Sequence, residues 1–206
     1  MVAAIAMEAA MADHARVVMV AGATGLVGQE ILAALLADKT YSAVHCVGRR
    51  ALAQQHPKLT CHVVDFAALP PLPKVDDCFI ALGTTIKVAG SQEAFRAIDL
   101  KAVEALALAV KRSGATNLGV ISAMGANSQS SVFYNRIKGE MEVSLARMGF
   151  KSLVIARPSM IDGDRATLHQ PGRIGEGMGL VLARGLGPLL PANYRAIKAS
   201  DIAHAL

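Results

Sequence analysis

The chain has 206 residues, of which 53% are hydrophobic and 18% charged, and its net charge is +5. This apolar fraction excludes a disordered chain, and no uninterrupted apolar run reaches the roughly 18 residues that a membrane-spanning helix needs. The basic residues are scattered apart from Arg49 and Arg50, and 4% aromatic residues are too few to stack on bases. We therefore expect one folded domain over residues 1–206 that binds neither nucleic acid nor membrane.

The cysteines and the first residues bear on the compartment. Cys46, Cys61 and Cys78 show no CxxC spacing, which indicates free thiols in a reducing environment, and we expect a cytoplasmic protein. Residues 1–15 are apolar but contain Glu8 and lack a basic segment, so they predict a helical lead-in and not a signal peptide. The six histidines lack the HxH and HxxxH spacings of metal ligands, and we expect no metal site.

Short aliphatic runs alternate with helical patterns along the chain. The runs predict buried strands at Arg16–Ala21, Ala43–Val47, Leu59–Val64, Cys78–Leu82, Leu118–Ser122 and Leu153–Arg157. Apolar residues at helical spacing predict helices at Gln29–Asp38, Gln92–Arg112 and Phe133–Met148. Buried strands between helices predict a Rossmann-type, doubly wound α/β fold, whose parallel sheet binds ligands at the carboxyl ends of its strands.

The pattern loosens after Pro158, where glycines and prolines lie close together. Residues 159–206 therefore predict a small substrate-side lobe within the same domain. The residues from Ser200 to Leu206 begin an N-capped helix that stops after about one turn. We therefore expect the chain to be truncated inside its final helix.

Three glycines in a GxxGxxG pattern join the first predicted strand to the first predicted helix. Gly22 permits a tight turn, Gly25 lets the backbone approach a pyrophosphate, and Gly28 lets the helix pack against the strand. Free N–H groups at the start of a helix favour an anion. A glycine turn without a ligand is the alternative, but this position predicts a dinucleotide-binding loop. The loop residues expected to contact the cofactor are Gly22, Thr24, Gly25, Leu26, Val27 and Gly28.

The second predicted strand is followed by Arg49 and Arg50, with no acidic residue to hold the ribose 2′-hydroxyl of NAD. Two guanidinium groups can instead pair with the 2′-phosphate of NADP, so this position favours NADP over NAD. Solvated surface charge is the alternative for either arginine. Asp65, just past the third predicted strand, is either an acceptor for the adenine amino group or an ordinary turn aspartate.

Tyr134 and Lys138 lie four residues apart, which places both side chains on one face of a predicted helix. An ammonium beside a phenol stabilises the phenolate and suits the pair to acid–base chemistry near neutral pH. Ser122 ends the fifth predicted strand, so it reaches the same sheet edge as the start of this helix. A YxxxK pattern alone occurs by chance on surface helices. Its position relative to Ser122 is what indicates a reactive triad.

Together these motifs resemble the short-chain dehydrogenase/reductase superfamily in its atypical or extended branch. The motifs are GATGLVG (22–28), VGRR (47–50), ALGTT (81–85), ISAMGA (121–126), YNRIK (134–138) and ARPSMI (156–161). Tat-interacting-protein-like oxidoreductases are the most similar group, and NmrA-like proteins are a more distant one. The resemblance covers residues 17–158 well and the tail less well.

The resemblance implies roles for individual residues. Ser122 would hold the substrate carbonyl or hydroxyl, Tyr134 would donate or accept the proton, and Lys138 would bind the nicotinamide ribose and tune Tyr134. Further implied cofactor contacts are the backbone of Leu82, Gly83 and Thr84 and the residues Arg157 and Pro158. Many members place an Asn in the helix after the fourth strand to complete a proton relay. In this chain Asp99 either replaces that Asn or only packs against the sheet.

The sequence thus predicts an NADP(H)-dependent oxidoreductase that acts on a small carbonyl or alcohol substrate, as a monomer or homodimer. Two alternatives stay open: an NAD(P)(H)-binding regulatory or scaffold protein without turnover, and a nucleotide-sugar epimerase-like enzyme. The Tyr–Lys pair favours an enzyme, because NmrA-like proteins that bind dinucleotide without reducing anything typically lack it. The short lobe after Pro158 offers few walls for a large nucleotide-sugar.

Overall fold

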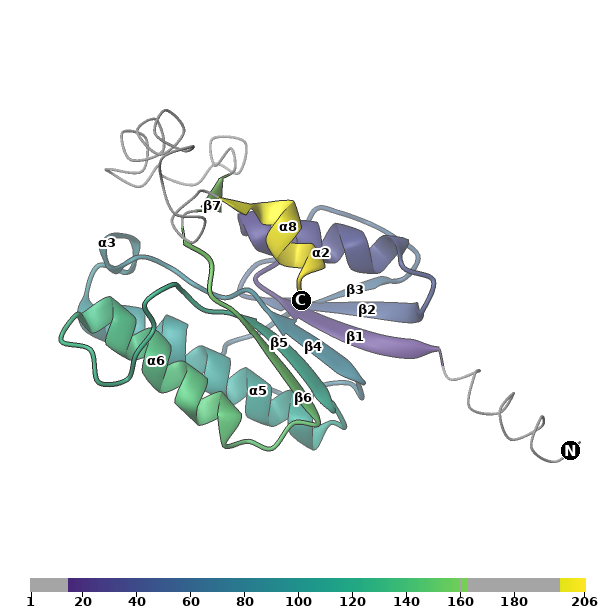
Figure 1. Cartoon of the computed structure of the whole chain (residues 1–206). Helices are drawn as coiled ribbons and strands as arrows, with labels where there is room; N and C mark the ends of the chain where they lie inside the picture. The colour runs from purple at the N-terminus through teal and green to yellow at the C-terminus, as the bar shows by residue number, and fades with distance from the viewer. Residues whose placement is uncertain (1–14, 160, 163–196) are drawn as a thin grey trace, which may run out of the picture.

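The architecture is a six-stranded parallel sheet with helices on both faces, as the computed structural model in Figure 1 shows. The structure describes residues 15–159, 161–162 and 197–206. The predicted helical lead-in over residues 1–14, and residues 160 and 163–196 of the predicted lobe, lie outside the described residues.

The strands of the sheet follow the predicted aliphatic runs. They are β1 (Arg16–Ala21), β2 (Tyr41–Gly48), β3 (Leu59–Val63), β4 (Asp77–Ile80), β5 (Asn117–Ile121) and β6 (Ser152–Ala156). Their order in space is β3-β2-β1-β4-β5-β6, so the direction of winding reverses between β1 and β4, where open α/β sheets bind ligands. The strand order confirms the predicted Rossmann-type fold.

The helices form one layer on each face of the sheet. They are α2 (Leu26–Ala37), α3 (Ile86–Ala89), α4 (Gln92–Arg96), α5 (Val103–Arg112), α6 (Phe133–Ala146) and α8 (Ala199–His204). In Figure 1, α2 and α8 lie on one face, and α5 and α6 lie on the other. Each face has its own buried core, with Val20 and Ile31 in the first and Leu106 and Met141 in the second.

Two helices differ from their predicted bounds in ways that affect the site. α2 begins at Leu26 and not at Gln29, because Gly25 is its N-cap and the glycine motif itself forms the first turn. The predicted helix over residues 92–112 is interrupted by a π-helical segment, η1 (Ala97–Ala102). An apolar pattern with a 3.6-residue period cannot reveal such a wide turn, and π segments are frequent at functional sites.

The remaining differences lie at the ends of elements and near the C-terminus. β4 ends at Ile80, earlier than predicted, and Ser122 follows β5 directly instead of ending it. α8 begins at Ala199 with Lys198 as its N-cap. A parallel pair of two-residue strands, β7 (Ile161–Asp162) and β8 (Ile197–Lys198), is an addition to the prediction.

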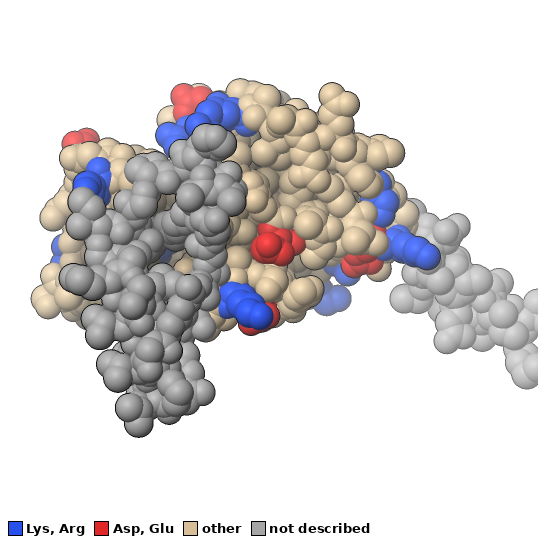
Figure 2. Space-filling view, turned by 90° about the horizontal axis from the view of Figure 1, so that it is seen from above, with Lys and Arg blue, Asp and Glu red and all other residues tan. Residues whose placement is uncertain are grey.

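The described part of the chain contains no helix long and apolar enough to cross a membrane. On the face of the molecule in Figure 2, the Lys and Arg side chains form separate small groups with Asp and Glu side chains close to some of them.

Candidate functional site

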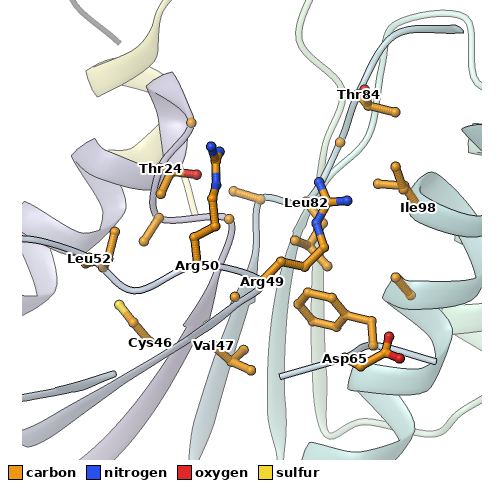
Figure 3. A pocket seen from close by; sticks show the side chains of 18 of the residues that line it. Thr24, Cys46, Val47, Arg49, Arg50, Leu52, Asp65, Leu82, Thr84 and Ile98 are labelled. Carbon is orange, nitrogen blue, oxygen red and sulfur yellow. The ribbon is translucent and has the colours of Figure 1, made fainter. Parts of the chain in front are cut away.

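A pocket of about 510 Å³ opens at the carboxyl edge of the sheet, between β1, β2 and β4 (Figure 3). Its walls are the loop from Gly22 to Gly25, the ends of β2 and β3, the segment from Ala81 to Thr85, and one side of η1. This is the switch point of the strand order, where the fold predicts a ligand.

The glycine loop is shaped by close backbone contacts. Gly22 has φ of 84°, and a Cβ there would lie 2.3 Å from the carbonyl oxygen of Ala81. A Cβ on Gly28 would lie 2.0 Å from the carbonyl oxygen of Gly22, so helix α2 packs directly against the turn. Gly25 donates its N–H to that same oxygen at 2.9 Å and starts the helix. These contacts leave a bare backbone turn at a helix N-terminus, which fits a pyrophosphate.

The cofactor-loop residues differ in how they face the pocket. Thr24 and Gly25 line it, whereas Leu26, Val27 and Gly28 belong to the first turn of α2 and are absent from its described lining. Val27 and Gly28 are buried against the core, so their part is to anchor the loop.

Arg49 and Arg50 are exposed at the end of β2 and line the pocket. Figure 3 shows both side chains extending into the pocket. Within the described residues neither guanidinium has a hydrogen bond or an ion pair, so both are available to an anion. Asp65 is the only acidic side chain among the described lining residues, and it accepts the N–H of Ala67 at 2.9 Å as a turn aspartate.

Lys138 is buried and pairs with Asp99. The Lys138 Nζ lies 2.7 Å from the Asp99 Oδ1, and the two side chains are 4% and 1% exposed. The Asp99 Oδ2 accepts the backbone N–H of Thr84 at 2.9 Å. A Cβ added to Gly83 would lie 3.4 Å from the same carboxylate. Asp99 in η1 therefore joins the pocket-lining segment after β4 to the helix that carries Lys138.

Ser122 and Tyr134, the other two residues of the predicted triad, lie directly after β5 and at the start of α6. Both are absent from the described lining of the pocket, as is Lys138. Ser122 is buried, and its Oγ has no hydrogen-bond partner among the described residues. Tyr134 is half-buried, and its ring centroid lies 5.5 Å from that of Phe95. Buried hydroxyls are normally hydrogen-bonded, so the Ser122 Oγ fits a group that awaits a ligand.

The loop from Ser122 to α6 is held against that helix at Gly139. A Cβ on Gly139 would lie 2.1 Å from the backbone nitrogen of Ser128, so only glycine permits this contact. The N–H of Asn127 also donates to the carbonyl oxygen of Asn135 at 3.0 Å. The sequence analysis did not single out Gly139, although it directly follows Lys138.

Arg157 and Pro158 lie just beyond β6 and are absent from the described lining of the pocket. Arg157 is exposed and forms a two-pronged ion pair with Glu142, which raises the pKa of its guanidinium. The carbonyl oxygen of Pro158 accepts the N–H of Met124 at 2.9 Å and so fixes the loop after Ser122.

Several lining residues were not predicted to contact a cofactor. They come from β2, β3, the segments that follow β3 and β4, and η1, and they include Cys46, Cys61, His62, Phe66, Thr85 and Ile98. Sequence alone would indicate them only once the order of the strands in the sheet is known. No cluster of three or more metal-binding side chains occurs among the residues that the structure describes.

Several solved structures share this fold. A short-chain dehydrogenase family protein from Francisella tularensis has a TM-score of 0.63 and 14% identity, covering 92% of this chain and 88% of that one. The NAD⁺ complex of WbmH from Bordetella bronchiseptica has a TM-score of 0.67 and 15% identity, covering 93% and 71%. A UDP-N-acetylglucosamine 4-epimerase from Methanobrevibacter ruminantium has a TM-score of 0.65 and 16% identity, covering 92% and 71%. The fold is that of these enzymes.

Comparison with models of protein families gives no match. Sequence relatives are nevertheless found in fungi. Protein fmp52-1 of Aspergillus terreus is 36% identical over 155 residues, covering 70% of this chain and 66% of that protein. The chain thus spans about two thirds of the length of this relative.

A longer alignment joins the chain to a yeast protein. FMP52 of Candida albicans is 31% identical over 194 residues, covering 88% of this chain and 82% of that protein. Both relatives are named as mitochondrial proteins, which contradicts the prediction of a cytoplasmic protein. Free cysteines indicate a reducing environment, but they do not identify the compartment. Because the alignment spans most of both chains, this chain belongs to the FMP52 family.

Proposed function

We propose that this chain is an NADP(H)-dependent oxidoreductase that acts on a small carbonyl or alcohol substrate. The observation that carries the proposal is the meeting of two features at one sheet edge. The pocket contains a glycine turn and two arginines that have no ion pair among the described residues, and Gly83 is one of its lining residues. A Cβ on Gly83 would lie 3.9 Å from the Nζ of the buried Lys138, whose helix also bears Tyr134. One feature suits a phosphorylated dinucleotide, and the other suits proton transfer.

The residues of the pocket fit a nicotinamide dinucleotide phosphate. The turn from Gly22 to Gly25 would hold the pyrophosphate, and Gly83 and Thr84 would line the nicotinamide side. The guanidinium groups of Arg49 and Arg50, which have no ion pair among the described residues, support a 2′-phosphate, which they can contact in a two-pronged manner. When bound, the dinucleotide supplies or accepts the hydride.

The chain itself would position the substrate and move a proton. The Ser122 Oγ, which has no hydrogen-bond partner among the described residues, would donate to the substrate oxygen, and the Tyr134 hydroxyl would give or take its proton. Lys138, which Asp99 holds in an ion pair, would stabilise the charge that develops on the phenol oxygen. Asp99 would act by holding Lys138, not as a substitute for a relay Asn.

The function is tested with NADPH absorbance against a panel of small aldehydes and ketones. On any substrate found, Tyr134→Phe should lower turnover by about 10²–10⁴-fold, because a general acid is lost. NADPH affinity, measured by calorimetry, should change little and serves as the control. Unchanged turnover in Tyr134→Phe would refute the assigned chemistry.

The cofactor preference is tested on the arginines. Arg49→Gln and Arg50→Gln should between them weaken NADPH binding by about tenfold or more, since charge-assisted hydrogen bonds are worth about 1.5–3 kcal/mol. NADH binding should stay the same, because NADH has no 2′-phosphate. Equal losses for both nucleotides would contradict a 2′-phosphate site.

The two alternative functions give different results in the same assays. Tight NADPH binding without turnover on the panel would favour a regulatory protein. A rise in melting temperature with a UDP-sugar would favour an epimerase-like enzyme, because a specific ligand stabilises the folded state by mass action. We further propose a mitochondrial location, on the names of the relatives, and a subfamily similar to the Tat-interacting-protein-like oxidoreductases.

A further inference from the structure

Two free cysteines stand opposite each other in the wall of the pocket. Cys46 on β2 and Cys61 on β3 are register partners in neighbouring parallel strands. Register partners project to the same face of a sheet, and neighbouring strands lie roughly 4.8 Å apart. Disulfides join residues whose Cα atoms are about 4.4–6.8 Å apart. The backbone therefore holds these two thiols within bridging range.

The two thiols differ in their access to an oxidant. Cys61 is exposed on the edge strand of the sheet, whereas Cys46 is buried. Burial raises the pKa of the Cys46 thiol to about 12, and the neighbouring Cys61 adds to the rise. Since burial shields a thiol from oxidants in solution, an oxidant reaches Cys61 first, and Cys46 reacts only afterwards, with the neighbouring Cys61 sulfur.

We propose that Cys46 and Cys61 are a peroxide-sensitive thiol pair that forms a disulfide in the wall of the dinucleotide pocket. The Cys61 sulfur first takes an oxygen from hydrogen peroxide, as the O–O bond breaks and one water leaves. The Cys46 sulfur then displaces that oxygen, which departs with the Cys46 proton as a second water. One peroxide is thereby reduced to two waters, and two thiols are oxidised to one disulfide.

The position of the pair couples its oxidation to dinucleotide binding, and this coupling rests on the proposed function. Both cysteines line the pocket, and Figure 3 shows Cys46 in its wall together with Leu52 and Arg50. A dinucleotide that fills the pocket covers Cys61 and slows its oxidation.

The chain is well suited to a direct test of the bridge. Cleavage after Lys and Arg places each cysteine in its own peptide, over residues 40–49, 59–74 and 75–87. The reduced full chain is treated with hydrogen peroxide, alkylated and digested without reductant. We expect mass spectrometry to find peptides 40–49 and 59–74 joined by a disulfide. Cys78, which is fully buried on β4, should stay a free thiol in its peptide and is the internal control.

Single variants distinguish the two roles. In Cys46→Ser we expect Cys61 to be oxidised further to sulfinic and sulfonic acid, because no neighbouring thiol can react with the sulfenic acid. In Cys61→Ser we expect Cys46 to remain reduced. Oxidation of Cys61 without a bridge in the unsubstituted chain, or a bridge that includes Cys78, would overturn the proposal.

A second arm tests the coupling. NADPH at ten times its dissociation constant leaves roughly one tenth of the molecules unliganded, so bridge formation should slow about tenfold. A chain that binds NADPH but forms the bridge at an unchanged rate would refute the coupling. A chain that forms the bridge but binds no NADPH would support the thiol pair and refute the proposed function.

Discussion

Two buried aspartates at opposite edges of one sheet show how the same side chain serves two purposes. At the amino edge, Asp77 on β4 accepts hydrogen bonds from Arg16, from the Tyr41 hydroxyl at 2.8 Å and from the Asn117 amide at 2.7 Å. Its partners come from β1, β2 and β5, so one carboxylate ties together the ends of four strands.

At the carboxyl edge, Asp99 instead links elements that surround the pocket. It accepts the N–H of Thr84 and pairs with Lys138 on α6, from a π-helical segment. The strand ends that Asp77 joins are the frame of the fold, whereas the segments that Asp99 joins bear the candidate chemistry. The comparison predicts that loss of Asp77 costs stability alone, whereas loss of Asp99 costs activity as well as stability.

The largest expected effect on stability is that of Asp77→Ala. This change leaves the Tyr41 hydroxyl and the Asn117 amide without their acceptor, so unfolding should become easier by roughly 3–5 kcal/mol. Urea denaturation at pH 7 measures the loss. Asp38→Ala, which removes an exposed aspartate, is the control and should cost less than about 1 kcal/mol. Similar losses in the free energy of unfolding for the two variants would contradict the structural role of Asp77.

The next effect is that of Asp99→Asn on turnover. The amide can still accept from Thr84 but leaves the Lys138 charge unpaired, so we expect kcat/KM to fall about a hundredfold, which is roughly 2.7 kcal/mol. Stability should fall too, because a buried ammonium loses its partner.

A second substitution separates the two losses. Adding Lys138→Met to Asp99→Asn removes the unpaired charge and should restore most of the stability but none of the turnover. Glu140→Gln breaks the partly exposed ion pair between Glu140 on α6 and Arg96 on α4, next to η1, and should affect neither property strongly. Recovery of turnover in the double variant would mean that Asp99 and Lys138 serve stability alone.

The smallest effect concerns Tyr41 at alkaline pH. Burial, and then its hydrogen bond to Asp77, raise the pKa of this phenol above its ordinary value of about 10. The unfolded chain therefore loses the proton first, and stability should fall as pH rises above about 10, by at most roughly 1.4 kcal/mol per pH unit. Tyr41→Phe should show a flatter decline between pH 9 and pH 11 in urea denaturation. Parallel curves for the two chains would contradict the shift.

The sequence predicted the sheet, because six short aliphatic runs that alternate with helical patterns are typical of buried parallel strands. It also predicted the glycine turn, since the contacts of Gly22 and Gly28 depend on glycine at those spacings. The pocket position of Arg49 and Arg50 followed from the end of one strand. Local patterns were sufficient for all of these.

The rest depended on contacts between distant segments. Two structural facts were needed to choose between the two roles of Asp99. One is the π-helical turn that carries it, which apolar spacing does not encode, and the other is its distance to Lys138. The pairing of Cys46 with Cys61 needed the register of β2 and β3. Such facts arise only when residues far apart in the chain are brought together.

The contact at Gly139 has a consequence for how such a site can evolve. The backbone of Ser128 lies where any side chain at position 139 would have to go. A methyl group there would push the backbone of Asn127 and Ser128 away from α6, and with it the loop that follows Ser122, although it removes no polar atom. The geometry of the candidate site thus depends on the absence of a side chain at position 139. A search restricted to chemically active side chains would not find that position.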